Sequence, residues 1–146
     1  VTTASYDSEE PEENPKPYNH ITLKAVEECV KSAFTGVILQ KPPIFSAVKV
    51  GGERAYSKAR KGEEVIIQPK EVTIHTFEIT SFEPPFIAFK IVCGKGTYIR
   101  SIARDLGVAL GCGAYMSELR RTRIGEFKIE DAYTIETFEE MVKALK

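Results

Sequence analysis

The sequence predicts an α+β domain with a mostly antiparallel mixed sheet and flanking helices. Stretches with helical spacing of apolar residues follow an acidic beginning, recur within the chain and close it. Between them lie short apolar runs that end at glycine or proline turns, as strands do. The chain has 146 residues, which is long enough to build one core.

The first twenty residues combine three prolines with an acidic run and one lysine, Lys16. This composition predicts a flexible arm or loop without packed structure. We therefore divide the chain into an acidic arm, residues 1–20, and a partial domain, residues 21–146. An arm of this kind also indicates that the chain begins in the middle of a larger fold.

A helix is predicted over residues 21–34, with Thr22 as its N-cap and Gly36 as its stop. A short strand follows at residues 37–39. The pair Pro42-Pro43 then excludes a helix and forces an extended segment.

The middle of the chain predicts strands separated by turns and one short helix. We expect strands at residues 45–50, 65–67, 72–79 and 86–93, a turn at Gly51-Gly52, and a helix over residues 55–61. The apolar phase shifts within residues 72–79, which indicates a bulge or bend. Both alternating sets of residues 86–93 are largely apolar, which predicts a strand buried on both sides.

The last third of the chain predicts two helices flanking two strands. The first helix runs from a cap at Thr97 to Leu110. Strands are expected at residues 115–121 and 126–129, around a turn at residues 123–125. A final amphipathic helix begins at Thr134, with its inward positions at Ile135, Phe138, Val142 and Leu145.

Cysteine and histidine usage argues against a metal site or a disulfide framework. The three cysteines have no paired spacing, and the two histidines, His20 and His75, carry no ligand motif. The sequence has neither a run of about 20 apolar residues nor a signal peptide pattern. These observations predict a cytoplasmic protein that binds no metal and inserts in no membrane.

The turn Gly94-Lys95-Gly96 and the helix after it have the features of an anion site. Free N–H groups at a helix start favour an anion, and Arg100 and Arg104 share one face of the helix. Tyr98 beside these arginines is able to stack a base. The simpler alternative is a solvated Lys95, a core Tyr98, and an Arg100 that pairs with Asp105 or a nearby glutamate.

Two further segments are rich in basic residues. Lys49, Arg54 and Arg60 lie in the first, and they either follow a phosphate backbone or coat a short helix. The second, Leu119-Arg120-Arg121-Thr122-Arg123, alternates along a predicted strand, so that one of its faces is able to meet RNA.

These segments resemble a known family when taken together. The chain contains P-P-x-F-S-A-x-K-x-x-G-x-R-A-Y-x-x-A-R-x-G, then K-G-T-Y-I-R-S-x-A-R-D-L-G, then L-R-R-T-R-x-G. In this order the three motifs resemble the TruB-like tRNA pseudouridine-55 synthase family over nearly the whole chain. The resemblance implies the catalytic domain of a pseudouridine synthase, here its C-terminal part.

The resemblance implies an isomerase that converts one uridine of the tRNA T-stem-loop to pseudouridine without a cofactor. It implies that Tyr98 contacts the flipped uridine, that Arg100 pairs with a catalytic aspartate, and that Leu119 meets the base. Asp7 resembles a supporting acid, and Lys49, Arg60 and Lys95 resemble RNA-facing or framework residues at lower specificity.

The chain departs from the family pattern at one important place. The family's nucleophile lies in an upstream G-x-L-D-x-x-A-T-G segment, and none of the aspartates Asp7, Asp105 and Asp131 has that context. We therefore expect a fragment that is inactive alone, and whose open sheet edges favour self-association. A non-catalytic RNA-binding module is the main alternative; a guide-dependent rRNA relative shares K-G-T-Y-I-R but fits the first motif less well.

Overall fold

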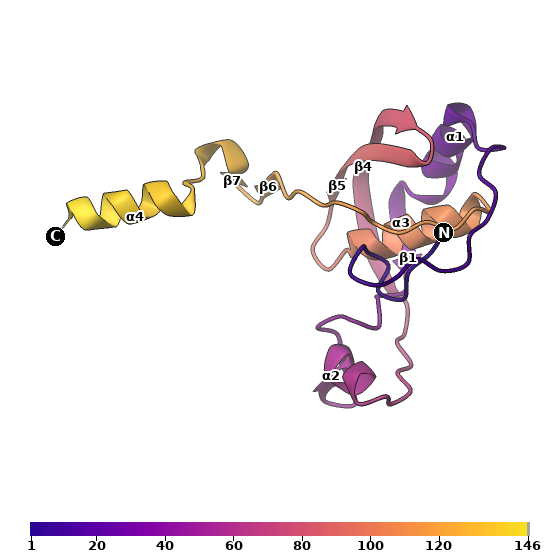
Figure 1. The fold of residues 1–146 in the computed structure, drawn as a ribbon, viewed down its shortest axis with the longest axis horizontal. Helices are drawn as coiled ribbons and strands as arrows, with labels where there is room; N and C mark the ends of the chain where they lie inside the picture. Colours follow the sequence, from indigo (N-terminus) through magenta and orange to yellow (C-terminus); the bar gives the residue numbers. More distant parts are fainter. Residues whose placement is uncertain (146) are drawn as a thin grey trace.

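The computed structural model describes residues 1–145 and confirms an α+β fold (Figure 1). The elements are α1 (Leu23–Ala33), β1 (Gly36–Gln40), β2 (Lys49–Val50), β3 (Glu53–Arg54), α2 (Ala55–Arg60), β4 (Lys70–Glu83), β5 (Phe86–Cys93), α3 (Ile99–Ala109), β6 (Arg123–Ile124), β7 (Phe127–Lys128), a 3-10 turn (Ile129–Asp131) and α4 (Ile135–Ala144).

The main sheet has three strands in the order β1-β4-β5, and both of its pairs are antiparallel. The register shifts between Ile74 and Thr76, and again between Ile79 and Ser81. The first shift explains the apolar phase change in the sequence, because an extra residue turns the following side chains to the other face.

Helices α1 and α3 pack with the sheet around one core. Val26, Val30, Ile74, Ile102 and Leu106 are buried there, with Phe34 beside them. Helix α1 begins where the sequence predicted, since the Thr22 side chain accepts a hydrogen bond from the backbone N–H of Ala25 at 3.2 Å.

The opposite face of the sheet stays open. Val37 and Leu39 of β1 are 66% and 72% exposed. Strand β5 alternates between exposed and half-buried residues over most of its length, so the prediction of burial on both sides was wrong. The reason is that α1 and α3 cover only one face, and no described element covers the other.

Residues 44–62, here called the α2 hairpin, project from the sheet as a small separate lobe (Figure 1). Strands β2 and β3 pair across Gly51 and Gly52, which both have positive φ and form the turn that the sequence predicted. The expected strand over residues 45–50 is reduced to Lys49–Val50, and residues 65–67 form no strand. Both stretches lie outside the main sheet, so that only Lys49–Val50 finds a partner, in β3.

The first residues of the chain are packed, contrary to the prediction of a free arm. Thr3, Ser5 and Asp7 are buried, and Thr2 forms an antiparallel bridge with Glu13. Residues 8–20 are exposed and irregular, as expected. Composition alone could not detect the packing, because the contacts come from residues about a hundred positions away.

After Ala114 the chain leaves the body in an extended stretch that ends in α4 (Figure 1). Residues 115–121 form only a bridge between Met116 and Asp7, and the predicted turn at 123–125 is instead strand β6 with Gly125. Thr134 caps α4 as predicted. Its apolar positions are exposed, however, because no described element packs against them: Ile135 76%, Phe138 57%, Val142 39% and Leu145 86%.

Within the described residues, no helix combines the length and apolar character that a membrane crossing needs.

Candidate functional site

Arg100, in the first turn of α3, connects three segments that are distant in sequence. Its Nη1 donates to the Ser5 carbonyl at 3.3 Å and to Asp7 Oδ2 at 3.1 Å. Its Nη2 donates to the Phe45 carbonyl at 2.8 Å. The planar guanidinium suits such a role, because its N–H groups point in fixed directions. Arg100 thereby joins the N-terminal segment and the base of the α2 hairpin to α3.

Asp7 is the carboxylate that Arg100 meets. Asp7 Oδ1 also accepts hydrogen bonds from the Ser5 hydroxyl at 2.6 Å and from the Glu9 backbone N–H at 3.1 Å. Burial disfavours the charged carboxylate, but these two hydrogen bonds and the Arg100 charge outweigh it and lower the pKa of Asp7. Asp7 is therefore held ionised at neutral pH.

The backbone before Asp7 is constrained. Tyr6 has a φ of 66°, which is uncommon for a residue with a bulky side chain. Its carbonyl accepts a hydrogen bond from the Met116 N–H at 2.9 Å, and the Arg104 guanidinium lies 4.6 Å from its ring centroid. These contacts fix the chain direction that aims Asp7 at Arg100.

Tyr98 is held by Gln40, the last residue of β1. The Tyr98 N–H donates to Gln40 Oε1 at 2.8 Å, and Gln40 Nε2 donates to the Tyr98 carbonyl at 3.1 Å. Gln40 is only 1% exposed. Both backbone groups of Tyr98 are thus fixed to the sheet, which leaves the orientation of its ring as the main remaining freedom.

Two adjoining cavities surround Arg100. The first, of about 480 Å³, is lined by Asp7, Glu9, Glu10, Phe45, Tyr56, Arg60, Arg100 and Met116. The second, of about 300 Å³, is lined by Phe45, Ser46, Ala47, Arg54, Tyr56, Tyr98 and Arg100. Aromatic walls with a few polar groups are typical of sites for planar ligands.

Tyr56 of α2 contacts both an aromatic ring and a cation. Its ring meets Phe45 edge to face, with 6.5 Å between the centroids. The Arg60 guanidinium lies over the same ring, 4.3 Å from the centroid. The α2 hairpin therefore supplies one wall of both cavities.

The simpler alternative for Arg100 was a bond to Asp105, and this is wrong. Asp105 instead pairs with Arg104, whose Nε donates to Asp105 Oδ1 at 2.7 Å. Arg104 also donates to the Lys41 carbonyl at 3.2 Å. One helical turn separates the two arginines, and each has its own acidic partner.

The structure brings together some of the predicted site residues and leaves others apart. Tyr98, Arg100, Asp7 and Arg60 line the two cavities. Among the described residues that line these cavities, Leu119 does not occur; it is 57% exposed on the stretch that leaves the body. Lys49, in β2, and Lys95, in the turn before α3, are exposed and do not line these cavities.

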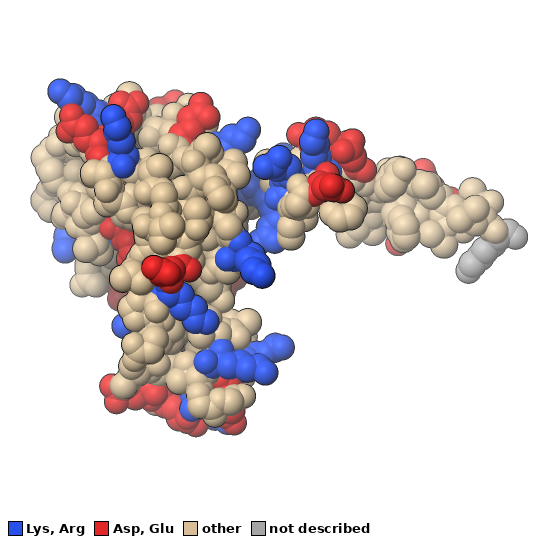
Figure 2. All heavy atoms as spheres, turned by 180° about the vertical axis from the view of Figure 1, so that it is seen from behind, with Lys and Arg blue, Asp and Glu red and all other residues tan. Residues whose placement is uncertain are grey.

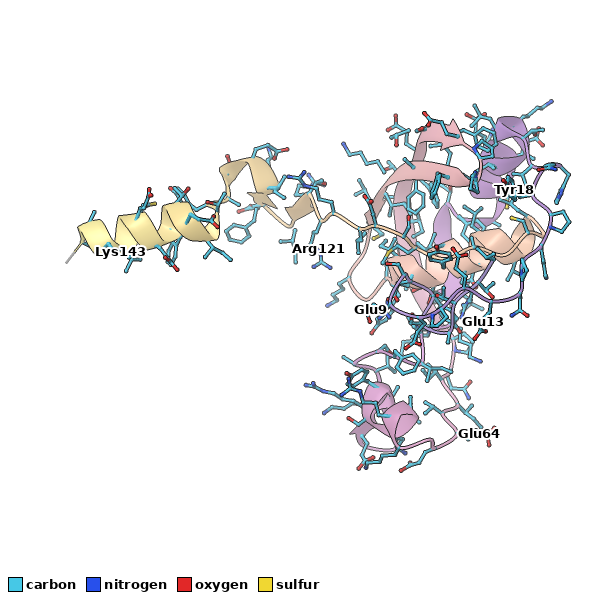
Figure 3. The ribbon with its side chains drawn as sticks, viewed as in Figure 1. Glu9, Glu13, Tyr18, Glu64, Arg121 and Lys143 are labelled. Carbon is cyan, nitrogen blue, oxygen red and sulfur yellow. The ribbon has the colours of Figure 1, made fainter. Side chains whose placement is uncertain are left out.

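Lysine and arginine side chains gather on two parts of the surface in Figure 2. One is the α2 hairpin. The other is the stretch between the body and α4, where Arg121 lies on the thin connection (Figure 3). The exposed basic residues of that stretch are Arg120, Arg121, Arg123 and Lys128. Glu9 and Glu13 lie on the N-terminal segment, apart from this stretch (Figure 3).

Sequence reasoning missed the roles of Gln40, Phe45 and Tyr56. All three stand in or beside the first motif, but nothing in their spacing showed that they would meet α3. The one available signal was Gln40, directly before the Lys-Pro-Pro segment. If a glutamine is buried, its amide has to be hydrogen-bonded, which would have indicated a contact with another segment.

Comparisons with known proteins identify the family of the chain. The family model described as TruB family pseudouridylate synthase (N terminal domain) matches residues 1–99. A second model, the tRNA pseudouridylate synthase B C-terminal domain, matches residues 100–146.

Curated relatives are named tRNA pseudouridine synthase B. One from Flavobacterium johnsoniae is 47% identical over 143 residues, and the match covers 98% of this chain and 62% of the relative. One from Phocaeicola vulgatus is 46% identical, with 96% and 59% covered. The chain thus spans about three fifths of the length of these relatives.

A solved structure, the crystal structure of a Cbf5-Nop10-Gar1 complex, contains a chain that is 34% identical. The two superpose with a TM-score of 0.59 over 76% of this chain and 28% of that one. On the family model that matches residues 1–99 and on these relatives, the chain belongs to the TruB family of pseudouridylate synthases.

Proposed function

We propose that the chain is the uridine-holding part of a tRNA pseudouridine synthase that acts on the T-stem-loop at position 55. The observation that carries the proposal is that Tyr98 and Arg100 share one aromatic cavity in a chain of this family. The reaction breaks the bond between the ribose and a uracil nitrogen and joins the ribose to a ring carbon. Substrate and product are isomers, so that no cofactor is consumed.

The target base has to leave the helical stack before it is able to react. The aromatic walls formed by Phe45, Tyr56 and Tyr98 would replace the stacking that the flipped base loses. The basic residues of the α2 hairpin and of residues 120–128 would hold the RNA backbone through its phosphates. In this proposal the basic surface binds the RNA backbone and the cavity binds one base.

Arg100 would present its charge to the catalytic aspartate of the upstream segment. Three of its N–H···O bonds go to Ser5, Asp7 and Phe45. A guanidinium has five N–H donors, so that donors remain for a second carboxylate. Because Asp7 already fixes the Arg100 guanidinium, Arg100 would keep its position when the catalytic aspartate binds to it.

The test is to join the chain to the upstream segment of the Flavobacterium johnsoniae relative and to map pseudouridine in a T-stem-loop RNA. We expect turnover by the joined protein and none by the chain alone. A non-catalytic RNA-binding module would instead show salt-dependent binding without turnover in either form.

Arg100→Ala in the joined protein should lower kcat at least a hundredfold while changing RNA affinity less than threefold. The reason is that Arg100 forms its hydrogen bonds inside the protein, where it orients carboxylates. Arg121→Ala is the matched control, because it removes the same guanidinium charge from an exposed position on the stretch between the body and α4. It should weaken RNA binding with little effect on kcat. Equal losses of affinity in both variants would contradict the role of Arg100.

Two further parts of the proposal concern the whole chain. The tRNA substrate implies the cytoplasm as the compartment. The exposed apolar face of α4 and the open sheet face support self-association of the chain when it is produced alone.

A further inference from the structure

Ser46 has a buried hydroxyl without a hydrogen-bond partner among the described residues. The residue is 6% exposed and belongs to the wall of the cavity that Tyr98 and Arg100 share. Other buried polar side chains are paired: Ser5 donates to Asp7, Thr3 donates to the Asp7 carbonyl, and Ser101 donates to the Lys41 carbonyl. Ser46 therefore departs from the pattern of this interior.

The backbone of Ser46 is firmly placed, so that the unpaired hydroxyl is not the result of a loose loop. Its N–H donates to the Ile44 carbonyl at 2.9 Å, and its carbonyl accepts from the Tyr56 N–H at 3.1 Å. The preceding carbonyl, that of Phe45, accepts from Arg100 at 2.8 Å. Ser46 is thus fixed next to the residue that organises the site.

An unpaired buried hydroxyl opposes folding, because it gives up water without gaining another partner. Alanine would fill the same space without that loss. A serine at this position is therefore better explained by a bond formed in another state, in which something enters the cavity.

The cavity limits what that partner is. About 300 Å³ with Phe45, Tyr56 and Tyr98 in its wall suits a planar ring, and Arg54 and Arg100 add positive charge. The edge of a uracil ring carries two carbonyl oxygens, which accept hydrogen bonds, and a serine hydroxyl is able to donate one.

We propose that the Ser46 hydroxyl donates a hydrogen bond to a carbonyl oxygen of the bound uracil ring and so helps to select uridine; this rests on the proposed function. The Ser46 hydroxyl oxygen is covered in the free chain, so that entry of the base has to shift the α2 hairpin. That hairpin projects from the body in Figure 1, and Ser46 is one of its first residues.

The first experiment compares Ser46→Ala with Ser57→Ala, which removes a hydroxyl from the same hairpin outside both cavities. In the chain, Ser46→Ala should leave the melting temperature unchanged or raise it. In the protein joined to the upstream segment, it should lower kcat/KM for a T-stem-loop RNA roughly tenfold. Ser57→Ala should change neither quantity.

The second experiment identifies the atom that Ser46 meets. RNAs with 2-thiouridine or 4-thiouridine at the target position replace one carbonyl oxygen by sulfur, a weak acceptor. One of the two should lower kcat/KM in the wild type and have no further effect in Ser46→Ala. The proposal would be overturned if the loss from Ser46→Ala added to the loss from thiouridine with both the 2-thiouridine and the 4-thiouridine RNA. A lower melting temperature of Ser46→Ala would also overturn it.

The outcomes separate this inference from the proposed function. If the joined wild-type protein forms pseudouridine and Ser46→Ala is equally active, only the role of Ser46 fails. If the joined wild type forms none, the proposed function fails. Binding of a T-stem-loop RNA by the chain then decides on Ser46, since the proposal requires weaker binding by Ser46→Ala than by Ser57→Ala.

Discussion

At the scale of single residues, the site depends on one ion pair in a mostly buried setting. The side chains of Arg100 and Asp7 are 22% and 12% exposed, so that solvent screens them little. Removing either partner leaves the other with an unpaired charge inside the protein, which costs more than the loss of a surface pair.

The pKa of Asp7 gives this pair a defined pH dependence. Because its folded pKa lies below the ordinary value of 3.8, the stability that it contributes is complete above that value and is lost as pH falls through the folded pKa. Asp7→Asn should lower the free energy of unfolding by about 2 kcal/mol at pH 7. The difference from the wild type should shrink below pH 4.

Denaturant unfolding at pH 7 and at pH 3 measures this difference. The control is Asp131→Asn, which changes an exposed carboxylate in the 3-10 turn before α4 and should show no such trend. A gap of constant size across this pH range would show that the Asp7 charge plays no part.

At the scale of elements, α3 is the frame on which the site is assembled. Gly107 lets the chain at Ala114 pass directly over the helix, since a Cβ at Gly107 would overlap the Ala114 backbone nitrogen. This close passage brings Met116 to the Tyr6 carbonyl and so supports the segment that carries Asp7.

Gly107→Ala should therefore destabilise the fold, by about 1–3 kcal/mol, despite the better helix propensity of alanine. Thermal unfolding measures the loss. Val108→Ala is the control, because Val108 is 68% exposed on the same helix and should change stability little. An unchanged melting temperature for Gly107→Ala would mean that the segment at Ala114 is able to move aside.

The elements also show where sequence reasoning succeeds and where it stops. Local signals placed α1, α2 and α4 closely: Thr22 and Thr134 cap their helices, and Gly51-Gly52 turns the hairpin. The predictions of strands at residues 65–67 and 115–121 were wrong, because a strand needs a pairing partner and sequence periodicity does not provide one.

The site was only partly predictable for the same reason. The motifs identified Tyr98 and Arg100, since helix-start chemistry and the family pattern agree there. The pairing of Arg100 with Asp7 joins residues 93 positions apart, and local spacing does not contain that contact. Leu119 was expected beside them, but the structure places it on the exposed stretch.

At the scale of the whole molecule, a packed body carries an extended arm that buries little of its apolar surface (Figure 1). Phe127 is 80% exposed and Phe138 57%. Exposed apolar patches of this kind usually mark a contact with another chain or segment.

The chain alone should therefore self-associate with increasing concentration. Light scattering should give a mean mass above that of the monomer, and Phe138→Gln should lower it. Glu140→Gln, on the same helix, is the control that should not lower it. A single monomer mass at every concentration would contradict the proposal.

The two hydrogen bonds between the Gln40 side chain and the Tyr98 backbone have a consequence for the interpretation of related sequences. The joint uses a donor and an acceptor on one side chain, and a flipped amide would turn both attractions into repulsions. Leucine offers neither group, and glutamate offers both only when it is protonated. The residue before a Lys-Pro-Pro segment is therefore a chemical marker: glutamine there permits this strand-to-helix joint, and its replacement predicts a differently seated tyrosine.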